Sequence, residues 1–175
     1  VGLSMTSLRP VSTKDIKRQL ELAKMSDFSD LINFDQWEGD FRQKIMSVEE
    51  RLNLLPMVPM RFEHMFNDGI YMRTMYAPAK TLMTSYIYAK PQICLISKGD
   101  VSYKSEVFGG RIDGPAMFKA DAGSKRIIYC HTDVVWTTVI KTDATNVQDA
   151  EKDIFISTYE EWDSRQCDNI ILVGG

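Results

Sequence analysis

The sequence predicts a mainly β protein: an antiparallel jelly-roll barrel preceded by a helical arm and followed by a helical or irregular extension. Short β-prone runs such as IYMRTMYA and VVWTTVIKT follow one another after Pro59 and are separated by turn signals. Many short strands at regular spacing are typical of an antiparallel sandwich or barrel, and in this order of a jelly roll. We therefore expect an arm over residues 1–55, the barrel over 56–143 and the extension over 144–175.

The arm begins with an amphipathic pattern. Ser12 and Thr13 precede the run KDIKRQLELAKM, in which Ile16, Leu20 and Ala23 recur at helical spacing among charged residues. A serine or threonine before such a run is a typical N-cap, because its side chain accepts a hydrogen bond from a free backbone N–H group. The pattern predicts a capped helix with one apolar face to bury.

A second helical pattern closes the arm. Trp37, Phe41 and Ile45 are spaced four residues apart. Ser47 and Glu50 have the spacing of a capping box, which predicts a short helix that ends before the next proline.

The barrel region is divided by clusters of glycine, proline, asparagine and aspartate, which favour turns. We expect each apolar run between them to be a strand, including LMTSYIYA and GRIDGPAMFKA. The turn signals are Asn67-Asp68-Gly69, Ala89-Lys90-Pro91, Lys98-Gly99-Asp100, Phe108-Gly109-Gly110 and Ala122-Gly123-Ser124.

The extension contains two polar segments, NVQDAEKDIF and STYEEWDSR, which are expected to be helical or irregular and to cross the outside of the barrel. The final IILVGG is a short β-prone run, whose edge would need a partner.

Composition argues against several classes of function. The net charge is −3, which does not favour nucleic acid or an anionic membrane surface as a partner. No run approaches the ~20 apolar residues of a membrane helix, and the first residues have no hydrophobic signal core. We expect a protein that is not secreted by a signal peptide and binds neither nucleic acid nor membranes.

The three cysteines form no close pair, which argues against a disulfide framework or a structural zinc site. Cys94 and Cys130 lie in apolar strand patterns and are expected to be buried free thiols. Cys167 lies in a polar segment and is expected to be exposed.

A series of short motifs keeps a common order between Met57 and about Ile156: Gly69-Ile70-Tyr71-Met72-Arg73, Pro78-Ala79, Lys98-Gly99, Gly123-Ser124-Lys125-Arg126, His131 and Val135-Trp136-Thr137-Thr138. This series resembles the small RmlC-like cupins of unknown function that tailed bacteriophages and prophages carry. The resemblance implies a cupin jelly-roll barrel and a location in the host cytoplasm or in the virion.

The metal ligands of the cupin pattern are missing. The resemblance aligns its two first-motif histidines with Tyr86 and Tyr88, its third ligand with Gln92, and the last histidine of its second motif with Arg126. Tyrosine hydroxyls and an amide cannot replace imidazole and carboxylate ligands, and an arginine repels a divalent cation. We therefore expect no metal and no other cofactor, and we assign no catalytic residue.

The same positions suggest a different use for the cavity. If Arg126 points inward with Tyr86, Tyr88 and Gln92, the site would favour an anionic or planar ligand. Alternatively, Arg126 is a solvated residue of the outer face, because strand alternation does not settle which of two neighbouring residues faces inward. His131 either contacts a ligand at the barrel mouth or forms a hydrogen bond to a turn.

Three functions remain open. The favoured one is a non-enzymatic phage accessory or virion-associated scaffold that forms a homo-oligomer through its barrel and arm and binds a phage structural protein. The second is a cupin that binds a small anionic, metabolite-like or nucleotide-like molecule. The third is a metal-independent, sugar-nucleotide epimerase-like enzyme, for which no matching histidine, aspartate and tyrosine can be assigned.

Overall fold

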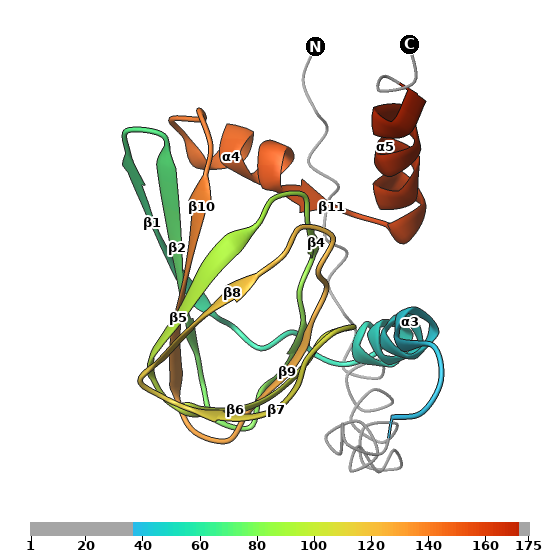
Figure 1. The fold of residues 1–175 in the computed structure, drawn as a ribbon. Helices are drawn as coiled ribbons and strands as arrows, with labels where there is room; N and C mark the ends of the chain where they lie inside the picture. Colours follow the sequence, from blue (N-terminus) through green and yellow to red (C-terminus); the bar gives the residue numbers. More distant parts are fainter. Residues whose placement is uncertain (1–36, 172–175) are drawn as a thin grey trace, which may run out of the picture.

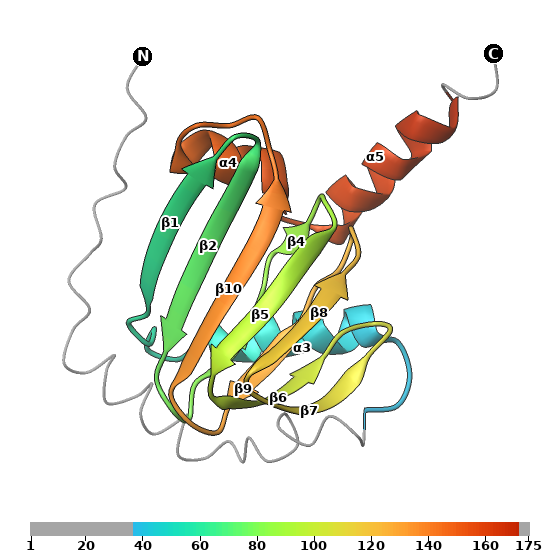
Figure 2. The same ribbon diagram turned by 60° about the vertical axis from the view of Figure 1, so that its left-hand side comes forward.

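The computed structural model describes residues 37–171, with side chains up to residue 167 (Figures 1 and 2). The helix predicted around Ile16 and Leu20 lies outside these residues.

The strands form two main sheets and one small ribbon. The first sheet has the order β1 (Arg61–Asn67), β2 (Ile70–Ala77), β10 (Val134–Lys141), β5 (Gln92–Lys98) and β8 (Ala116–Ala120). The second sheet has the order β3 (Leu82–Thr84), β9 (Ile127–Cys130), β6 (Asp100–Lys104) and β7 (Gly109–Asp113). The ribbon pairs β4 (Ile87–Tyr88) with β11 (Phe155–Ile156).

The strand order is that of a jelly roll. With the hairpin strand β1 and the ribbon set aside, the first strand pairs with the last (β2 with β10) and the second with the second-last (β3 with β9). Inside these pairs, β5 lies beside β8, and β6 lies beside β7. All pairs are antiparallel, and from β2 to β10, with β4 set aside, successive strands alternate between the two sheets except at the β6–β7 hairpin, which lies within the second sheet. This nested pairing confirms the predicted mainly β jelly roll of cupin type.

Side-chain alternation along the strands builds the core between the sheets. On β10, Val134, Trp136, Thr138 and Ile140 are buried and point inward. Val134 and Trp136 meet inward residues of the second sheet, such as Tyr103, in one apolar cluster, and Ile140 packs in another with Tyr71 and Ile154. The core thus lies between the two sheets.

Two predicted strands are each divided in two. LMTSYIYA forms β3 and β4, which belong to different sheets, because the chain leaves the second sheet after Thr84. GRIDGPAMFKA forms β7 and β8, which are joined through a cis Gly114–Pro115 bond and also lie in different sheets. Both runs are continuous in hydrophobicity, so the pattern alone did not reveal the break.

The helix α3 (Phe41–Leu52) covers the outer face of the second sheet (Figure 1). Ile45 and Val48 are buried against Ile127 of β9. The predicted capping box at Ser47 was wrong. Asp40 is the N-cap, and its carboxylate accepts a hydrogen bond from the backbone N–H of Arg42 at 2.9 Å. The helix therefore begins earlier than predicted, and Ser47 lies within it.

Two helices follow the barrel, α4 (Val147–Ile154) and α5 (Tyr159–Ile171). Ile170 and Ile171 belong to α5 and not to a β-prone run as predicted. Trp162 of α5 packs so closely on Gly123 that an added Cβ there would lie 2.5 Å from the indole ring. Gly123 also has a positive φ of 79°, which favours glycine. Among the described helices, none is both long and apolar enough to cross a membrane.

Candidate functional site

A cavity of about 1080 Å³ is bordered by the inner faces of the two sheets and opens to solvent beside exposed residues such as Met57. The segment that follows α3, from Leu52 to Met60, contributes to its lining, as do residues of β2, β3, β9 and β10. Its apolar lining includes Met60, Phe62, Met75, Met83, Ile128 and Trp136. A cavity of this size with mostly apolar walls is typical of a small-molecule site, whose specificity comes from a few polar groups.

Arg126 is the most unusual of these polar groups. It immediately precedes β9, lines the cavity and is only 1% exposed. Its Nη2 donates to Ser124 Oγ at 3.2 Å, and its Nη1 makes a long contact of 3.5 Å with the sulfur of Cys94. Its Cζ lies 4.8 Å from the ring centroid of Tyr88. The buried Nε has no hydrogen-bond partner, and no carboxylate of the described residues pairs with the guanidinium.

A buried guanidinium whose partners within the protein are all neutral is energetically costly. Arginine stays protonated in proteins, so Arg126 cannot escape burial by losing its charge. A buried charge without a partner of opposite sign is costly, and neutral partners such as a hydroxyl and a thiol compensate only part of the cost. An anion bound beside Arg126 would supply the negative charge that no described residue places there.

A second arginine enters the cavity from the opposite sheet. Arg73 on β2 lines the cavity, and its Cζ lies 4.0 Å from the ring centroid of Phe62. Its Nε is also buried without a hydrogen-bond partner, and among the described side chains it forms no ion pair. Its partner across the β2–β10 ladder is Thr138, which in turn lies opposite Cys94 on β5. Arg73, Thr138 and Cys94 thus form one cross-strand row, and the side chain of Arg126 contacts the Cys94 end of that row.

The third cation of the cavity is already neutralised. Lys125 has a side chain that is only 7% exposed, and its Nζ lies 2.7 Å from Glu49 Oε1 of α3. Thr84 donates a hydrogen bond of 2.7 Å to the same oxygen. This ion pair joins α3 to the second sheet beside the cavity. Lys80 also lines the cavity, but it is exposed to solvent. Arg126 and Arg73 are therefore the cations of the described lining that have a buried polar atom without a partner.

The structure brings together only part of the predicted constellation. Tyr88 and Arg126 are in contact in the cavity wall. Tyr86 is half exposed at the rim, where it stacks on Phe155 with a centroid distance of 4.9 Å. Gln92 is buried on the same face of β5 as Cys94, but it does not line the cavity. Both of its amide atoms lack a hydrogen-bond partner.

His131 does not belong to this site. Its Nε2 lies 2.8 Å from Ser102 Oγ, and its ring contacts Tyr129 edge-on at 4.9 Å. Cys130 points into the core, so the neighbouring residues Tyr129 and His131 point away from it. The backbone N–H of His131 donates to the carbonyl of Asp100, the first residue of β6, at 2.8 Å. The prediction that placed His131 at the barrel mouth is replaced by this position.

The sequence analysis missed Arg73 and Glu49. The signal for Arg73 was present, because in IYMRTMYA it alternates in phase with Tyr71 and Met75, both apolar or aromatic. An arginine on the apolar face of a strand marks a buried cation. Glu49 carried no such signal, since its partner Lys125 is distant in sequence and only the docking of α3 brings them together.

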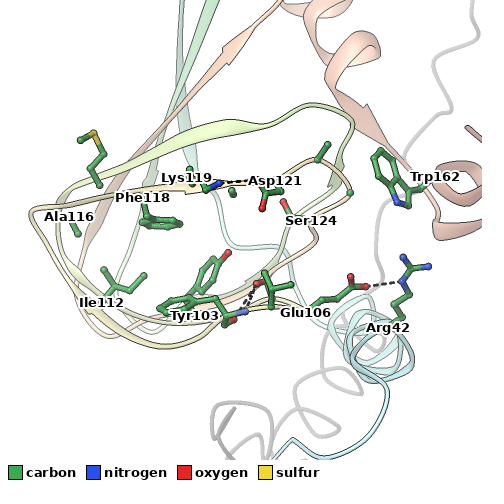
Figure 3. Close-up of a pocket in the computed structure, with 17 residues that line it drawn as sticks. Arg42, Tyr103, Glu106, Ile112, Ala116, Phe118, Lys119, Asp121, Ser124 and Trp162 are labelled. Atoms are coloured by element: carbon green, nitrogen blue, oxygen red, sulfur yellow. Dashed lines mark hydrogen bonds and ion pairs between the residues drawn. The ribbon is translucent and has the colours of Figure 1, made fainter. Parts of the chain in front are cut away.

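A second cavity, of about 500 Å³, opens between β7, β8 and α5. Figure 3 shows Tyr103, Phe118 and Ile112 on its inner side and Trp162 facing it from α5. Trp136 of the first cavity stacks with Tyr103 at 6.1 Å and meets Phe118 edge-on at 5.6 Å. Aromatic rings thus separate the two cavities.

The charged residues around the second cavity have partners within the protein. Arg42 pairs with Glu106 at 2.8 Å, and Lys119 lies 3.8 Å from Asp121. The arginines of the first cavity have no such partners. The first cavity is therefore the better candidate for binding a charged molecule.

The burial of the three cysteines agrees with the prediction from the sequence. Cys94 and Cys130 are buried free thiols, and Cys167 is exposed, as predicted. Burial raises the pKa of the Cys94 thiol, and it raises the pKa of Cys130 to about 11. A raised thiol pKa keeps the group protonated, so the nucleophilic thiolate is scarce at neutral pH and forms only as pH rises.

We therefore expect a thiol reagent such as dithionitrobenzoate to label one cysteine per folded chain at pH 8. All three should react after denaturation in urea. The variant Cys167→Ser should lose the native signal and keep the other two. Rapid native labelling of that variant would contradict the burial of Cys94 and Cys130.

Among the described residues, no group of three or more histidine, cysteine, aspartate or glutamate side chains could hold a metal ion. The expected absence of a metal from the protein stays a prediction.

Comparison with known proteins finds similar folds among solved structures. No family model matches the sequence, and no curated protein matches it. Among solved structures, a cupin superfamily protein from Desulfitobacterium hafniense aligns with a TM-score of 0.43 and 9% identity over 52% of this chain and 86% of its own. KdgF from a Halomonas species aligns with a TM-score of 0.44 and 10% identity, over 52% and 84% of the two chains. An RmlC-like cupin family protein from Methanocaldococcus jannaschii aligns with a TM-score of 0.41 and 13% identity, over 48% and 81%. The first and third of these structures carry the cupin description. The jelly roll of this chain is defined by its own strand order.

Proposed function

We propose that the protein binds a small anionic molecule in the cavity between its two sheets, with Arg126 as the main charged contact. The observation that carries this proposal is the burial of Arg126, at 1% exposure, without an anionic partner among the described residues. A guanidinium with an unpaired buried Nε offers directed donors to a carboxylate or phosphate.

The energetic argument concerns the cost of keeping Arg126 buried. Hydrogen bonds to charged groups contribute about 1.5–3 kcal/mol each, roughly twice the value for neutral pairs. The free protein holds Arg126 with a neutral hydroxyl, a thiol and an aromatic face. A bound anion would offset the desolvation of the cation. The apolar remainder of the cavity, including Trp136 and Met75, would contact the rest of the molecule.

The positions of the histidines favour binding over an epimerase-like reaction. The chain has two histidines, and neither lines the cavity. His64 Nδ1 lies 2.7 Å from the hydroxyl of Tyr71, and His131 lies beside Ser102. Glu49, a carboxylate of the lining, is held by Lys125. The groups nearest Arg126 therefore suit recognition of an anion more than proton transfer.

The interpretation as a phage accessory or virion scaffold remains a prediction, as does assembly into a homo-oligomer. The scaffold and the oligomer were predicted to form through both the barrel and the arm over residues 1–55, and most of the arm lies outside the described part of the chain. An anion-binding barrel is compatible with either role, because an oligomer of this chain would carry one such cavity in each subunit.

A thermal-shift screen tests the proposal. The probes are carboxylates, sugar phosphates and nucleoside monophosphates at matched ionic strength. A ligand at 100 times its Kd adds about 2.7 kcal/mol to the free energy of unfolding, which should raise Tm by roughly 5–10 °C for a chain of this size. We expect at least one probe to do so and Arg126→Gln to abolish the shift.

The matched control is Arg111→Gln, which removes an exposed arginine paired with Asp100 outside both cavities. It should leave the shift unchanged. A shift that survives in Arg126→Gln, or the absence of any shift across the three classes of anion, would count against the proposal.

A further inference from the structure

The cavity contains a second guanidinium with no anionic partner. Arg73 lies on β2, on the opposite wall from Arg126. Its Cζ is 4.0 Å from the centroid of Phe62 and 5.4 Å from that of Phe155, and its Nε is buried without a hydrogen bond. Aromatic faces stabilise a cation only partly, so Arg73 can also accept an anion.

The ladder places the two arginines on different walls of the cavity. Arg73 faces Thr138, and Thr138 faces Cys94, whose sulfur contacts Arg126. Two strand spacings therefore separate the backbone at Arg73 from the backbone at Cys94, or roughly 10 Å. The two guanidinium groups enter the cavity from different sheets, so each can bond an acidic group of its own.

Apolar and aromatic side chains line the cavity beside the two cations. The ring centroid of Phe62 lies 4.0 Å from the Cζ of Arg73, and that of Tyr88 lies 4.8 Å from the Cζ of Arg126. Met75 and Trp136 belong to the same lining. An uncharged, apolar spacer suits this region, whereas a chain with further charges does not.

We infer that the ligand carries two acidic groups joined by a short apolar spacer, one group for Arg126 and the other for Arg73. The inference rests on the proposed function and names the class of molecule that the same cavity takes. Two negative charges would balance the two unpaired cations, while Lys125 stays neutralised by Glu49.

Isothermal titration calorimetry with matched acids tests this inference. The dicarboxylates adipate and pimelate are compared with the monocarboxylates hexanoate and heptanoate, which have the same chain lengths. We expect each dicarboxylate to bind about tenfold or more tightly than its matched monocarboxylate, because the second acid gains a charge-assisted bond to Arg73. Phosphonopropionate and its dicarboxylate counterpart succinate show whether a phosphonate is preferred to a second carboxylate.

The variants separate the two arginines. Arg73→Gln should remove the preference for dicarboxylates and leave monocarboxylate affinity unchanged, whereas Arg126→Gln should weaken both series. Arg73→Lys keeps the charge and should keep part of the preference. It also guards against a loss of folding in the glutamine variant.

The outcomes distinguish the two proposals. If monocarboxylates bind as tightly as dicarboxylates and depend on Arg126, the inference fails and the proposed function stands. The inference also fails if Arg73→Gln weakens both series equally. If no acid of either series binds, the inference is overturned, and the thermal-shift screen with sugar phosphates and nucleoside monophosphates decides the proposed function.

Discussion

Replacement of Arg126 by methionine is expected to make the ligand-free protein more stable while it abolishes anion binding. Arg126 is a fully buried cation whose nearest partners are neutral. Methionine keeps much of the side-chain length and removes the desolvation cost. Hydrophobic replacement of buried charged groups has raised stability by about 1–4 kcal/mol. We expect a gain in this range in the free energy of unfolding, measured by urea denaturation without added anions.

Two further measurements make this prediction specific. The dependence of unfolding free energy on urea should keep its slope, since a changed slope would mean a changed unfolded or native state. The control Arg111→Met removes an exposed arginine and should change stability by no more than about 1 kcal/mol. A loss of stability in Arg126→Met would contradict the prediction, because it would show that the cation is well compensated without a ligand.

The second large effect concerns the ion pair between Glu49 and Lys125. Glu49→Leu should cost about 3–5 kcal/mol, because it leaves the ammonium of Lys125 buried without a counter-charge. Lys125→Met should cost less, since the Glu49 side chain is 28% exposed and can be hydrated by water. In that variant the Glu49 carboxylate also keeps its hydrogen bond from Thr84.

A double-mutant cycle measures the coupling. The double variant Glu49→Leu with Lys125→Met should be more stable than Glu49→Leu alone, because no unpaired charge remains. Urea denaturation of the four proteins gives the interaction energy. If the two single costs simply add, Glu49 and Lys125 do not stabilise each other. Anion binding should weaken in Glu49→Leu as well, since α3 positions the segment from Leu52 to Met60 that lines the cavity.

Local patterns in the sequence were enough to predict the class of fold. Strand alternation is a local property, so IYMRTMYA and VVWTTVIKT identified β2 and β10 with few errors. The burial of Cys94 and Cys130 followed from the same patterns. Helix ends were less secure. Asp40, and not Ser47, caps α3, because several residues could cap the helix and packing of Ile45 and Val48 on β9 selects its extent.

The candidate site was predicted in part. The sequence pointed to Arg126, Tyr88, Tyr86 and Gln92 but did not determine which of Lys125 and Arg126 faces the cavity. The structure buries both, with Arg126 between the sheets and Lys125 against α3. His131 was grouped with them because it follows a buried strand.

The sequence by itself determined most of the order of strands and turns. It also pointed to one cation, Arg126, among the residues of the apolar barrel. Only the tertiary structure decided which cations remain unpaired. Pairing depends on contacts between distant elements, such as Glu49 of α3 with Lys125 and the shared row of Arg73 and Cys94. Burial of a charge and the distance to its nearest opposite charge arise from packing, so no local pattern encodes them.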